Sequence, residues 1–491
     1  MIDPAVYKRY RVTIGIECHV QLKTKTKLFA AVNNDAREAS PNTLVSHICF
    51  GLPGALPVLN EAAIELAVRA AFALNSRPQT FSKFDRKHYF YPDLPMGYQI
   101  TQYDEPIITE GSVNIEVNGQ TKKIGITRAH LEADAGKTTH PAGADYSLVD
   151  LNRAGTPLLE IVSEPDMHTS LEAKAYAREL YLTMRYADVS DANLYYGNMR
   201  FDVNVSVSDS DELGTRTETK NLNSFRSVER AVEYEIDRQI ELIEKGKRVV
   251  QETRGWDEAK QKTISQRNKE NADDYRYMPD PDLPPVVLDD NYIEKIKKAM
   301  PVLPCEWRRR LVSLGLDSSQ IEILLEAEVE DGQVNYLSLI ETLLDQPEVA
   351  RQAANWQINV EIPLRREEQL PSVYSNNERL GLYKWLYKAF KEGRMNSNQA
   401  HQLLQLALRE SAMPSDIQKY AESRGLLQES NESAILEIVT TVLQENPKAA
   451  TDVKDGEMKA IGFLVGQVMK KSSGKANPVV AQDLIKRQLG L

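Results

Sequence analysis

The chain has 491 residues, which is enough for two or three domains. Its 60 basic and 71 acidic residues give a net charge of -11, so a surface that is basic throughout is excluded, although a local basic patch is not. Three widely separated cysteines imply no disulfide framework, and the lack of a leader sequence or a long apolar run predicts a cytoplasmic protein that does not enter a membrane.

The distribution of glycine and proline predicts two changes of organisation along the chain. Residues up to about 290 contain short alternating segments and Gly/Pro turns, whereas helical periodicity dominates from Asn291 onward. A boundary near residue 295 and a weaker one at 405–410 give predicted domains of residues 1–295, 296–407 and 408–491.

The first predicted strand, residues 12–22, has an apolar face and a polar face. Apolar side chains occupy every even position, so the two-residue repeat of a strand places Glu17 and His19 side by side on the opposite face. Further along, residues 84–93 (FDRKHYFYPD) combine aromatic and cationic side chains beside a proline turn. This segment is either a stacking surface for a base or nucleoside or an aromatic strand that enters a turn.

Two more predicted strands, within residues 127–134 and 199–207, repeat the alternation. Their polar faces carry Arg128, His130, Glu132, Asp134, Arg200, Asp202, Asn204 and Ser206. A solvent-facing sheet gives the same pattern, and each strand alone is consistent with one. The residue types favour a site, because solvated strands usually carry Thr, Lys and Glu rather than histidine with carboxylates.

If these strands are neighbours, their acids and the histidine gather around one hard cation. Mg²⁺ or Mn²⁺ suits such ligands better than structural zinc. The predicted metal ligands are Glu17, His19, Glu132 and Asp202. The cations Arg128, Arg200 and Lys220 would then hold phosphates.

A helix is predicted over residues 225–243, where apolar residues recur at spacings of three and four. Asn223 or Ser224 can cap it, and Gly246 ends it. Lys220 precedes this helix and is either a phosphate ligand or a surface lysine. Residues 274–284 (DYRYMPDPDLP) predict an extended loop whose acids are structural. The Walker A motif and the protein-kinase motif set are both missing from the sequence, so any ATP is held by another kind of fold.

Taken together, these segments resemble the GatB family, the B subunits of glutamyl/aspartyl-tRNA amidotransferases. The resemblance covers nearly the whole chain. It is carried by the segments IGIECHVQL (14–22), FGLPGALPVLN (50–60), FDRKHYFYPDLPMGYQITQYD (84–104), AHLEADAGK (129–137), VDLNRAGTPLLEIVSEPD (149–166), NMRFDVNVSV (198–207), TKNLNSF (219–225), QETRGWDE (251–258), DYRYMPDPDLPP (274–285) and, in a YqeY-like tail, IGFLVGQVMKKSSGKANP (461–478).

The resemblance implies an α+β protein with an N-terminal cradle domain built around an antiparallel sheet, a helical domain and a small helical tail. It implies a ligase that phosphorylates the side-chain carboxylate of Glu-tRNA(Gln) or Asp-tRNA(Asn) with ATP and Mg²⁺, and then amidates it with ammonia. An amidase subunit (GatA) would deliver the ammonia through a tunnel, and a small subunit (GatC) would complete a heterotrimer. Phosphorylation is chemically necessary because hydroxide is a poor leaving group, and the acyl phosphate needs an enclosed site.

The resemblance adds weight to the polar faces and assigns roles to them. Glu17, His19, Glu132 and Asp202 are expected to bind or orient Mg²⁺. The expected ATP contacts are Arg200, Asn204, Ser206 and Lys220. Lys87, Tyr89 and Tyr91 are expected to line the aminoacyl end, so the catalytic set comprises Glu17, Lys87, Tyr89, Tyr91 and Glu132.

The sequence departs from the family at several positions. Many relatives have a four-cysteine zinc knuckle, whereas here the four positions are Ala30, Val32, Ser46 and Cys49, so we expect no structural zinc. Met96 replaces a usual lysine, Ala133 a usual acid, and the pair Tyr195 and Tyr196 a common acidic pair.

The last 33 residues form a basic tail, with six basic side chains and one acid. A solvated helix face explains such a run, but the resemblance favours tRNA contact through Lys470, Lys471 and Lys475. Two other functions stay open, a metal-dependent phosphohydrolase that needs no partner and a tRNA-binding scaffold without catalysis. The sequence does not distinguish Glu-tRNA(Gln) from Asp-tRNA(Asn) as the working substrate.

Overall fold

The computed structural model describes residues 4–268, 272–332, 334–371, 374–428, 432–457, 459–472 and 476–491. The chain forms two compact units, Met1–Glu306 and Trp307–Leu491. The strands lie in the first unit and the second is helical, which confirms the predicted α+β class. The three predicted domains and their two boundaries stay a prediction.

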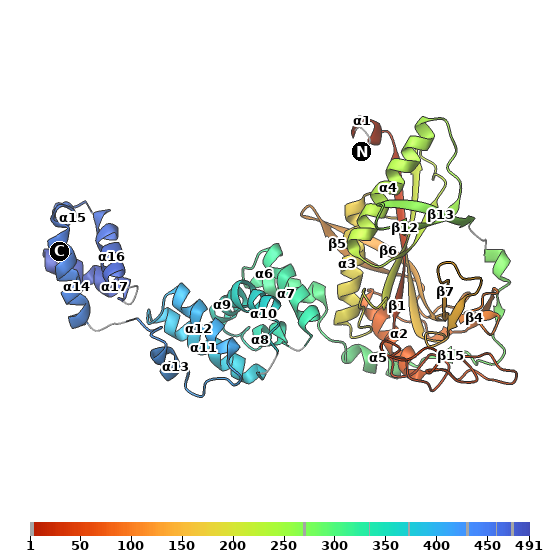
Figure 1. Ribbon diagram of the computed structural model, residues 1–491, viewed down its shortest axis with the longest axis horizontal. Coiled ribbons are helices and arrows are strands. Elements are labelled where there is room, and N and C mark those ends of the chain that lie inside the picture. Colours follow the sequence, from red (N-terminus) through yellow and green to blue (C-terminus); the bar gives the residue numbers. More distant parts are fainter. Residues whose placement is uncertain are drawn as a thin grey trace. The chain divides into compact units, whose positions relative to one another are not determined.

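A large mixed sheet dominates the first unit (Figure 1). Its strands are β1 (Arg11–Gln21), β3 (Asp85–His88), β4 (Tyr98–Thr101), β5 (Gly111–Val117), β6 (Gln120–Ala133), β9 (Pro157–Ser163), β10 (Met199–Ser208), β11 (Thr217–Leu222), β12 (Glu252–Asp257), β13 (Lys262–Asn268) and β14 (Met278–Pro279). They follow the order β13-β12-β11-β10-β1-β9-β6-β4-β3-β14, with β5 paired to β6. The described pairings in this sheet are antiparallel except for the parallel pair β11–β12.

The three strands singled out in the sequence lie at the centre of this sheet. β1 pairs with β10 on one side and with β9 on the other, and β9 pairs with β6. The registers place Glu17 opposite Asp202, and Glu160 opposite both His19 and His130. Residues directly opposite in a ladder project to the same face, so these side chains share one face of the sheet.

The other face of the sheet carries the core of this unit. The even-numbered residues of β1 are buried there together with apolar side chains of α2 (Glu61–Ala73), α3 (Ser170–Tyr186) and α4 (Phe225–Glu244). The predicted helix is α4: Ser224 caps it by accepting from the Ser227 amide, and its apolar stripe is buried. The remaining helices of this unit are α1 (Pro4–Tyr7), η1 (Ala272–Tyr275) and α5 (Asp290–Lys298), and α6 (Pro304–Ser313) crosses the boundary between the units.

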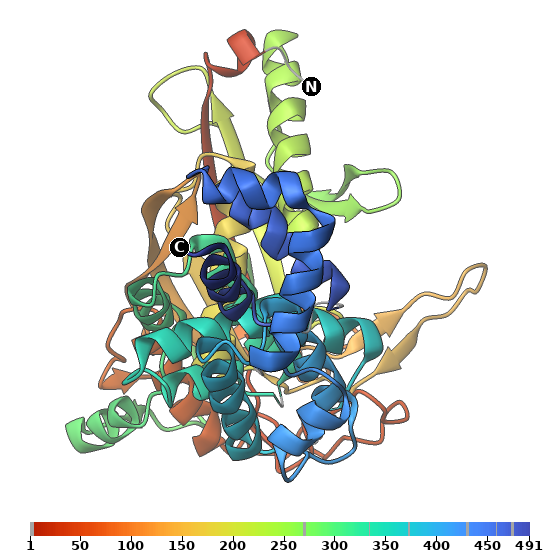
Figure 2. The same cartoon turned by 90° about the vertical axis from the view of Figure 1, so that its left-hand side faces the viewer.

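Two small sheets complete the first unit. β2 (Phe81–Ser82) pairs with β15 (Val286–Val287), and β7 (Lys137–Thr139) pairs with β8 (Leu148–Asp150) in a hairpin that extends outward (Figure 2). Two acids of the predicted 274–284 loop have a structural role, because Arg86 donates to Asp280 at 3.0 Å and to Asp282 at 2.8 Å. The segment is not a loop throughout, since it includes the end of η1 and the strand β14.

The positions that correspond to the zinc knuckle lie around a buried lysine. The Lys27 ammonium donates to the Leu44 carbonyl at 2.7 Å and lies 3.5 Å from the Cys49 sulfur. Ser46 Oγ is 3.6 Å from the same sulfur. A cation and hydrogen bonds therefore hold this loop, and the expected lack of structural zinc stays a prediction.

The second unit is built from helices packed around buried side chains. Its helices are α7 (Ser318–Asp331), α8 (Tyr336–Glu341), α9 (Pro347–Trp356), the π-helical turn η2 (Gln357–Glu361), α10 (Ile362–Glu368), α11 (Asn376–Lys391), α12 (Ser397–Arg409), α13 (Ile417–Ser423), α14 (Glu432–Glu445), α15 (Pro447–Lys454), α16 (Ala460–Lys471) and α17 (Pro478–Leu489). The last four share an apolar core of their own. Over the described ranges, every helix is too short or too polar to cross a bilayer.

Candidate functional site

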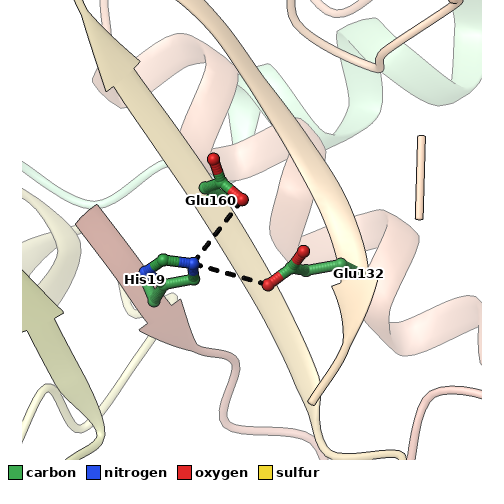
Figure 3. A group of neighbouring side chains, drawn as sticks. All are labelled: His19, Glu132 and Glu160. Carbon is green, nitrogen blue, oxygen red and sulfur yellow. Dashed lines mark ion pairs between the residues drawn. The ribbon is translucent and has the colours of Figure 1, made fainter. Parts of the chain in front are cut away.

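A histidine and two glutamates from three adjacent strands meet on the polar face (Figure 3). His19 Nε2 on β1 lies 3.6 Å from Glu132 Oε1 on β6 and 3.5 Å from Glu160 Oε2 on β9. One ligand atom from each residue lies within 4.8 Å of the others. Behind them, the buried His130 places its Nε2 3.4 Å from the same Glu160 oxygen. The ladder registers position all four side chains.

Burial and mutual charge decide how these groups ionise. Burial lowers the pKa of His19, but the carboxylates of Glu160 and Glu132 outweigh it and raise the pKa to about 9. Burial, reinforced by the Glu160 charge, raises the pKa of Glu132 to about 7. Burial also opposes ionisation of Glu160, but His130, His19 and nearby Lys87 lower its pKa below the usual range. The face therefore holds one firm anion, a protonated imidazole and a carboxyl that titrates near neutrality.

The other predicted metal ligands lie on the same face but have partners of their own. Asp202 accepts from Lys220 Nζ at 2.7 Å and from the Asn221 amide at 2.7 Å. Glu17 accepts from Asn204 Nδ2 at 2.9 Å. Whether they also reach a bound cation stays a prediction.

The predicted phosphate-binding cations lie in three different settings. Lys220 is held between Asp202 and Glu218, whose charges outweigh the effect of burial and raise its pKa. Arg200 pairs with Asp134 at 3.0 Å. Arg128 donates to the backbone carbonyls of residues 102 and 103 and so fixes a loop. Lys220 lines the cavity described next, so it is the best placed of the three.

A cavity of about 650 Å³ opens over His19 and Glu160. It is lined by Glu17, His19, Lys87, Tyr89, Tyr91, Asp93, Ala135, Glu160, Arg216, Glu218, Lys220, Asn221, Gln251, Thr253, Tyr275 and Tyr277. The predicted aminoacyl residues Lys87, Tyr89 and Tyr91 are thus on its wall. The Lys87 ammonium lies 4.7 Å from the Tyr275 ring centre; burial opposes its charge, but Tyr277 and the two glutamates raise its pKa.

A second cavity of about 330 Å³ shares Glu17 and Arg216 with the first. It takes in the predicted ATP contacts Asn204 and Ser206, next to Thr13 and Gly15. Gly214 closes one side, where a Cβ atom would overlap the Val207 carbonyl oxygen, so only glycine allows this approach. Of the predicted ATP contacts, Lys220 lines the first cavity and Asn204 and Ser206 line the second, whereas Arg200 lines neither.

The donor set of His19, Glu132 and Glu160 suits a hard divalent cation. One neutral imidazole nitrogen and carboxylate oxygens from separate strands are ligands that Mg²⁺ and Mn²⁺ accept, and the set lacks the thiolates of a structural zinc site. His19, which is protonated next to the two glutamates, would release its proton when a cation binds. Sequence reasoning missed Glu160 because β9 is apolar on both sides of it, in the run PLLEIVS. The signal was a single acid inside an apolar strand.

Two of the predicted tRNA-binding lysines, Lys470 and Lys471, lie in the last turn of α16. Lys470 is exposed, whereas Lys471 Nζ pairs with Glu445 at 2.6 Å. Lys475 lies outside the described residues.

Comparison with known proteins identifies the family. Residues 12–294 match the GatB/GatE catalytic domain and residues 338–489 match the GatB domain. The chain is 43% identical over 485 residues to the B subunit of the aspartyl/glutamyl-tRNA(Asn/Gln) amidotransferase of Caldicellulosiruptor saccharolyticus, covering 98% of this chain and 99% of that protein. Proteins of the same name from Thermotoga maritima and Thermoanaerobacter pseudethanolicus are 42% and 44% identical, with the same coverage. The chain therefore belongs to the GatB/GatE family.

Proposed function

We propose that this chain is the B subunit of a cytoplasmic tRNA-dependent amidotransferase. Its N-terminal unit would phosphorylate the side-chain carboxylate of Glu-tRNA(Gln) or Asp-tRNA(Asn) with ATP and then form the amide with ammonia. The ammonia would come from an amidase subunit (GatA), with a small subunit (GatC) completing the complex. The proposal rests on the sequence similarity, across 98% of the chain, to relatives named as B subunits of aspartyl/glutamyl-tRNA(Asn/Gln) amidotransferases.

The geometry of the site supports this chemistry. His19, Glu132 and Glu160 would hold Mg²⁺, which when bound would neutralise phosphate charge during phosphoryl transfer. Lys220 would contact phosphates from the floor of the larger cavity, and Asn204 and Ser206 would hold the nucleotide in the smaller one.

The aminoacyl group would enter the larger cavity from the side of Lys87. The ammonium of Lys87 would attract the substrate carboxylate, and Tyr89 and Tyr91 would form an aromatic wall that limits water around the acyl phosphate. Tyr89 OH lies 3.4 Å from Gln99 Oε1, which supports the position of its ring.

The test is ATP hydrolysis by the chain reconstituted with the amidase and small subunits. We expect stimulation by Glu-tRNA(Gln), by Asp-tRNA(Asn) or by both, and none by uncharged tRNA. In Glu132→Gln, stimulated hydrolysis and amidation should be lost while tRNA binding survives. Turnover that ignores aminoacylation would instead indicate a phosphohydrolase, and tRNA binding without turnover would indicate a scaffold.

A further inference from the structure

A third cavity, of about 440 Å³, lies on the same face of the sheet as the first cavity, which would hold the reacting groups and is named the reaction cavity. Gln21 of β1 lines it, and His19 lines the reaction cavity. The two side chains are two residues apart on one strand face, a separation of about 7 Å. The segment that follows β6 has the same spacing, because Ala135 lines the reaction cavity and Lys137, two residues later, lines the third cavity.

The third cavity is lined by four basic residues, Lys23, Arg37, Lys137 and Arg153, and by three acids, Asp35, Asp150 and Asp191. Arg153 lines it and donates to the carbonyls of Ala135 and Gly136, at 3.0 and 2.6 Å, so its guanidinium is fixed at the boundary between the cavities. Lys137 is exposed, and no ion pair involves it within the described part of the chain. Asn34 also lines the cavity; it is 95% buried, and its Oδ1 has no hydrogen-bond partner among the described residues.

One of two neighbouring exposed tyrosines lines this cavity. Tyr195 is 88% exposed and Tyr196 is 53% exposed, and their rings meet edge to face with centroids 5.1 Å apart. Tyr196 lines the cavity, and the Arg37 guanidinium lies 5.8 Å from its ring centre. Arg37 is itself fixed by two hydrogen bonds to Asp35, at 2.7 and 2.6 Å. Large aromatic rings held in water beside fixed cations are the surface on which unpaired bases stack.

From these contacts we infer that the third cavity binds the unpaired nucleotides next to the aminoacylated 3′ end of the substrate tRNA. Tyr196 stacks on a base, and Arg37 and Lys137 hold the adjoining phosphates. The adjacent terminal nucleotide then lies at the reaction cavity, because the two cavities are about one strand step of two residues apart. The inference rests on the proposed function. It also gives a role to the position at which this chain carries tyrosines in place of an acidic pair.

The test compares two RNAs and two substitutions in the reconstituted complex. The RNAs are the intact substrate tRNA and the same tRNA without its unpaired 3′ nucleotides. Tyr196→Ala should weaken binding of the intact tRNA by roughly 5- to 150-fold, the loss of one stacked base, and leave binding of the truncated tRNA unchanged. Tyr196→Phe keeps the ring and should restore binding. Lys137→Gln should flatten the salt dependence by about one phosphate contact, again only with the intact tRNA.

Each other outcome overturns the inference. An equal loss with both tRNAs would indicate a general structural role for Tyr196, and no loss with either would exclude stacking. Dissociation of the complex in Tyr196→Ala, seen by size-exclusion chromatography, would indicate that Tyr196 contacts another subunit instead. If Tyr196→Ala keeps the wild-type KM for misacylated tRNA in stimulated ATP hydrolysis, the subsite fails while the proposed function stands. If the wild-type complex binds neither tRNA, both fail.

Discussion

At the scale of single residues, Glu160 is the centre of the candidate metal site. It faces His19 on one neighbouring strand and His130 on the other, at 3.5 and 3.4 Å. Its pKa is lowered although burial opposes its charge, so it is the acid of this group that stays ionised. Carboxylates that ligate metals are held in this way by outer partners that fix their orientation.

Glu160→Gln should weaken Mn²⁺ binding to the full chain by at least about 10-fold, because an amide supplies no charge to the cation. Glu116→Gln, on the exposed face of β5, is the matched control and should bind Mn²⁺ as the wild type does. Isothermal titration of Mn²⁺ measures both. Equal affinity in the two variants would remove Glu160 from the ligand set.

At the scale of elements, the junction of η2, α10 and α11 is held by a buried charge cluster. Glu361 accepts from Arg379 at 2.9 Å, from Arg365 at 3.0 Å and from the Tyr383 hydroxyl at 2.5 Å. The glutamate and Arg379 are completely buried. Burial opposes ionisation of Glu361, but the two arginines outweigh it and lower its pKa. Three helical segments thus share one anion.

The sign of the pH dependence follows from that lowered pKa. Ionised Glu361 contributes stability above its unfolded pKa of about 4.3, and the contribution is lost as the pH falls through the lower folded value. Glu361→Gln should therefore reduce the free energy of unfolding at pH 7 by roughly 3–5 kcal/mol, because it leaves two buried arginines without their anion. The difference from the wild type should shrink below about pH 4.

Urea unfolding of the full chain, followed by circular dichroism at several pH values, measures this difference. Glu378→Gln is a useful control, since Glu378 is solvent-exposed and caps the N-terminus of the same helix α11. A difference between wild type and Glu361→Gln that is constant from pH 7 to 3 would contradict the assigned ionisation.

At the scale of the whole molecule, an acidic chain carries a basic C-terminal segment. The net charge of the protein is -11, yet Lys470 lies exposed at the end of α16. Lys471 is partly neutralised by Glu445. Contact with a tRNA backbone at this end would therefore depend more on Lys470 than the sequence alone indicates.

Lys470→Glu should weaken tRNA binding and flatten its dependence on salt by about one phosphate contact. Lys384→Glu, an exposed lysine on α11, makes the same change in net charge and serves as the control. Filter binding at several salt concentrations distinguishes them. Indistinguishable salt slopes for the two variants would show that only net charge matters.

The part of the site that could be predicted is the part encoded by alternation within one strand. The faces of β1, β6 and β10 follow from their own residues, and so do the positions of His19 and Glu132 on the polar faces of their strands. Which strands are neighbours depends on pairing between distant segments, and β9 separates β1 from β6. Glu160 was missed for that reason, since its strand has no polar pattern of its own.

The side-chain partners of individual residues also could not be predicted from the sequence. Asp202 and Lys220 are each plausible as a ligand, but in the structure they form an ion pair with each other at 2.7 Å. The helix α4 was fully predictable, because its cap and apolar stripe are local. In the sequence, Tyr195 and Tyr196 stand out only because they replace an acidic pair common in the family. Their exposure to solvent follows from the structure.

The position of β1 has a consequence for how the protein is made. β1 leaves the ribosome before its partners β9 and β10, which end at Ser163 and Ser208. At a translation rate of about 5–20 residues per second, β1 remains without a partner strand for on the order of ten seconds or more. Over that interval the nascent chain exposes an unpaired strand of alternating Val, Ile and Cys, which is prone to aggregation. Both neighbours of β1 are complete only after residue 208 has been made, so a pause before that point should lower the yield of folded protein.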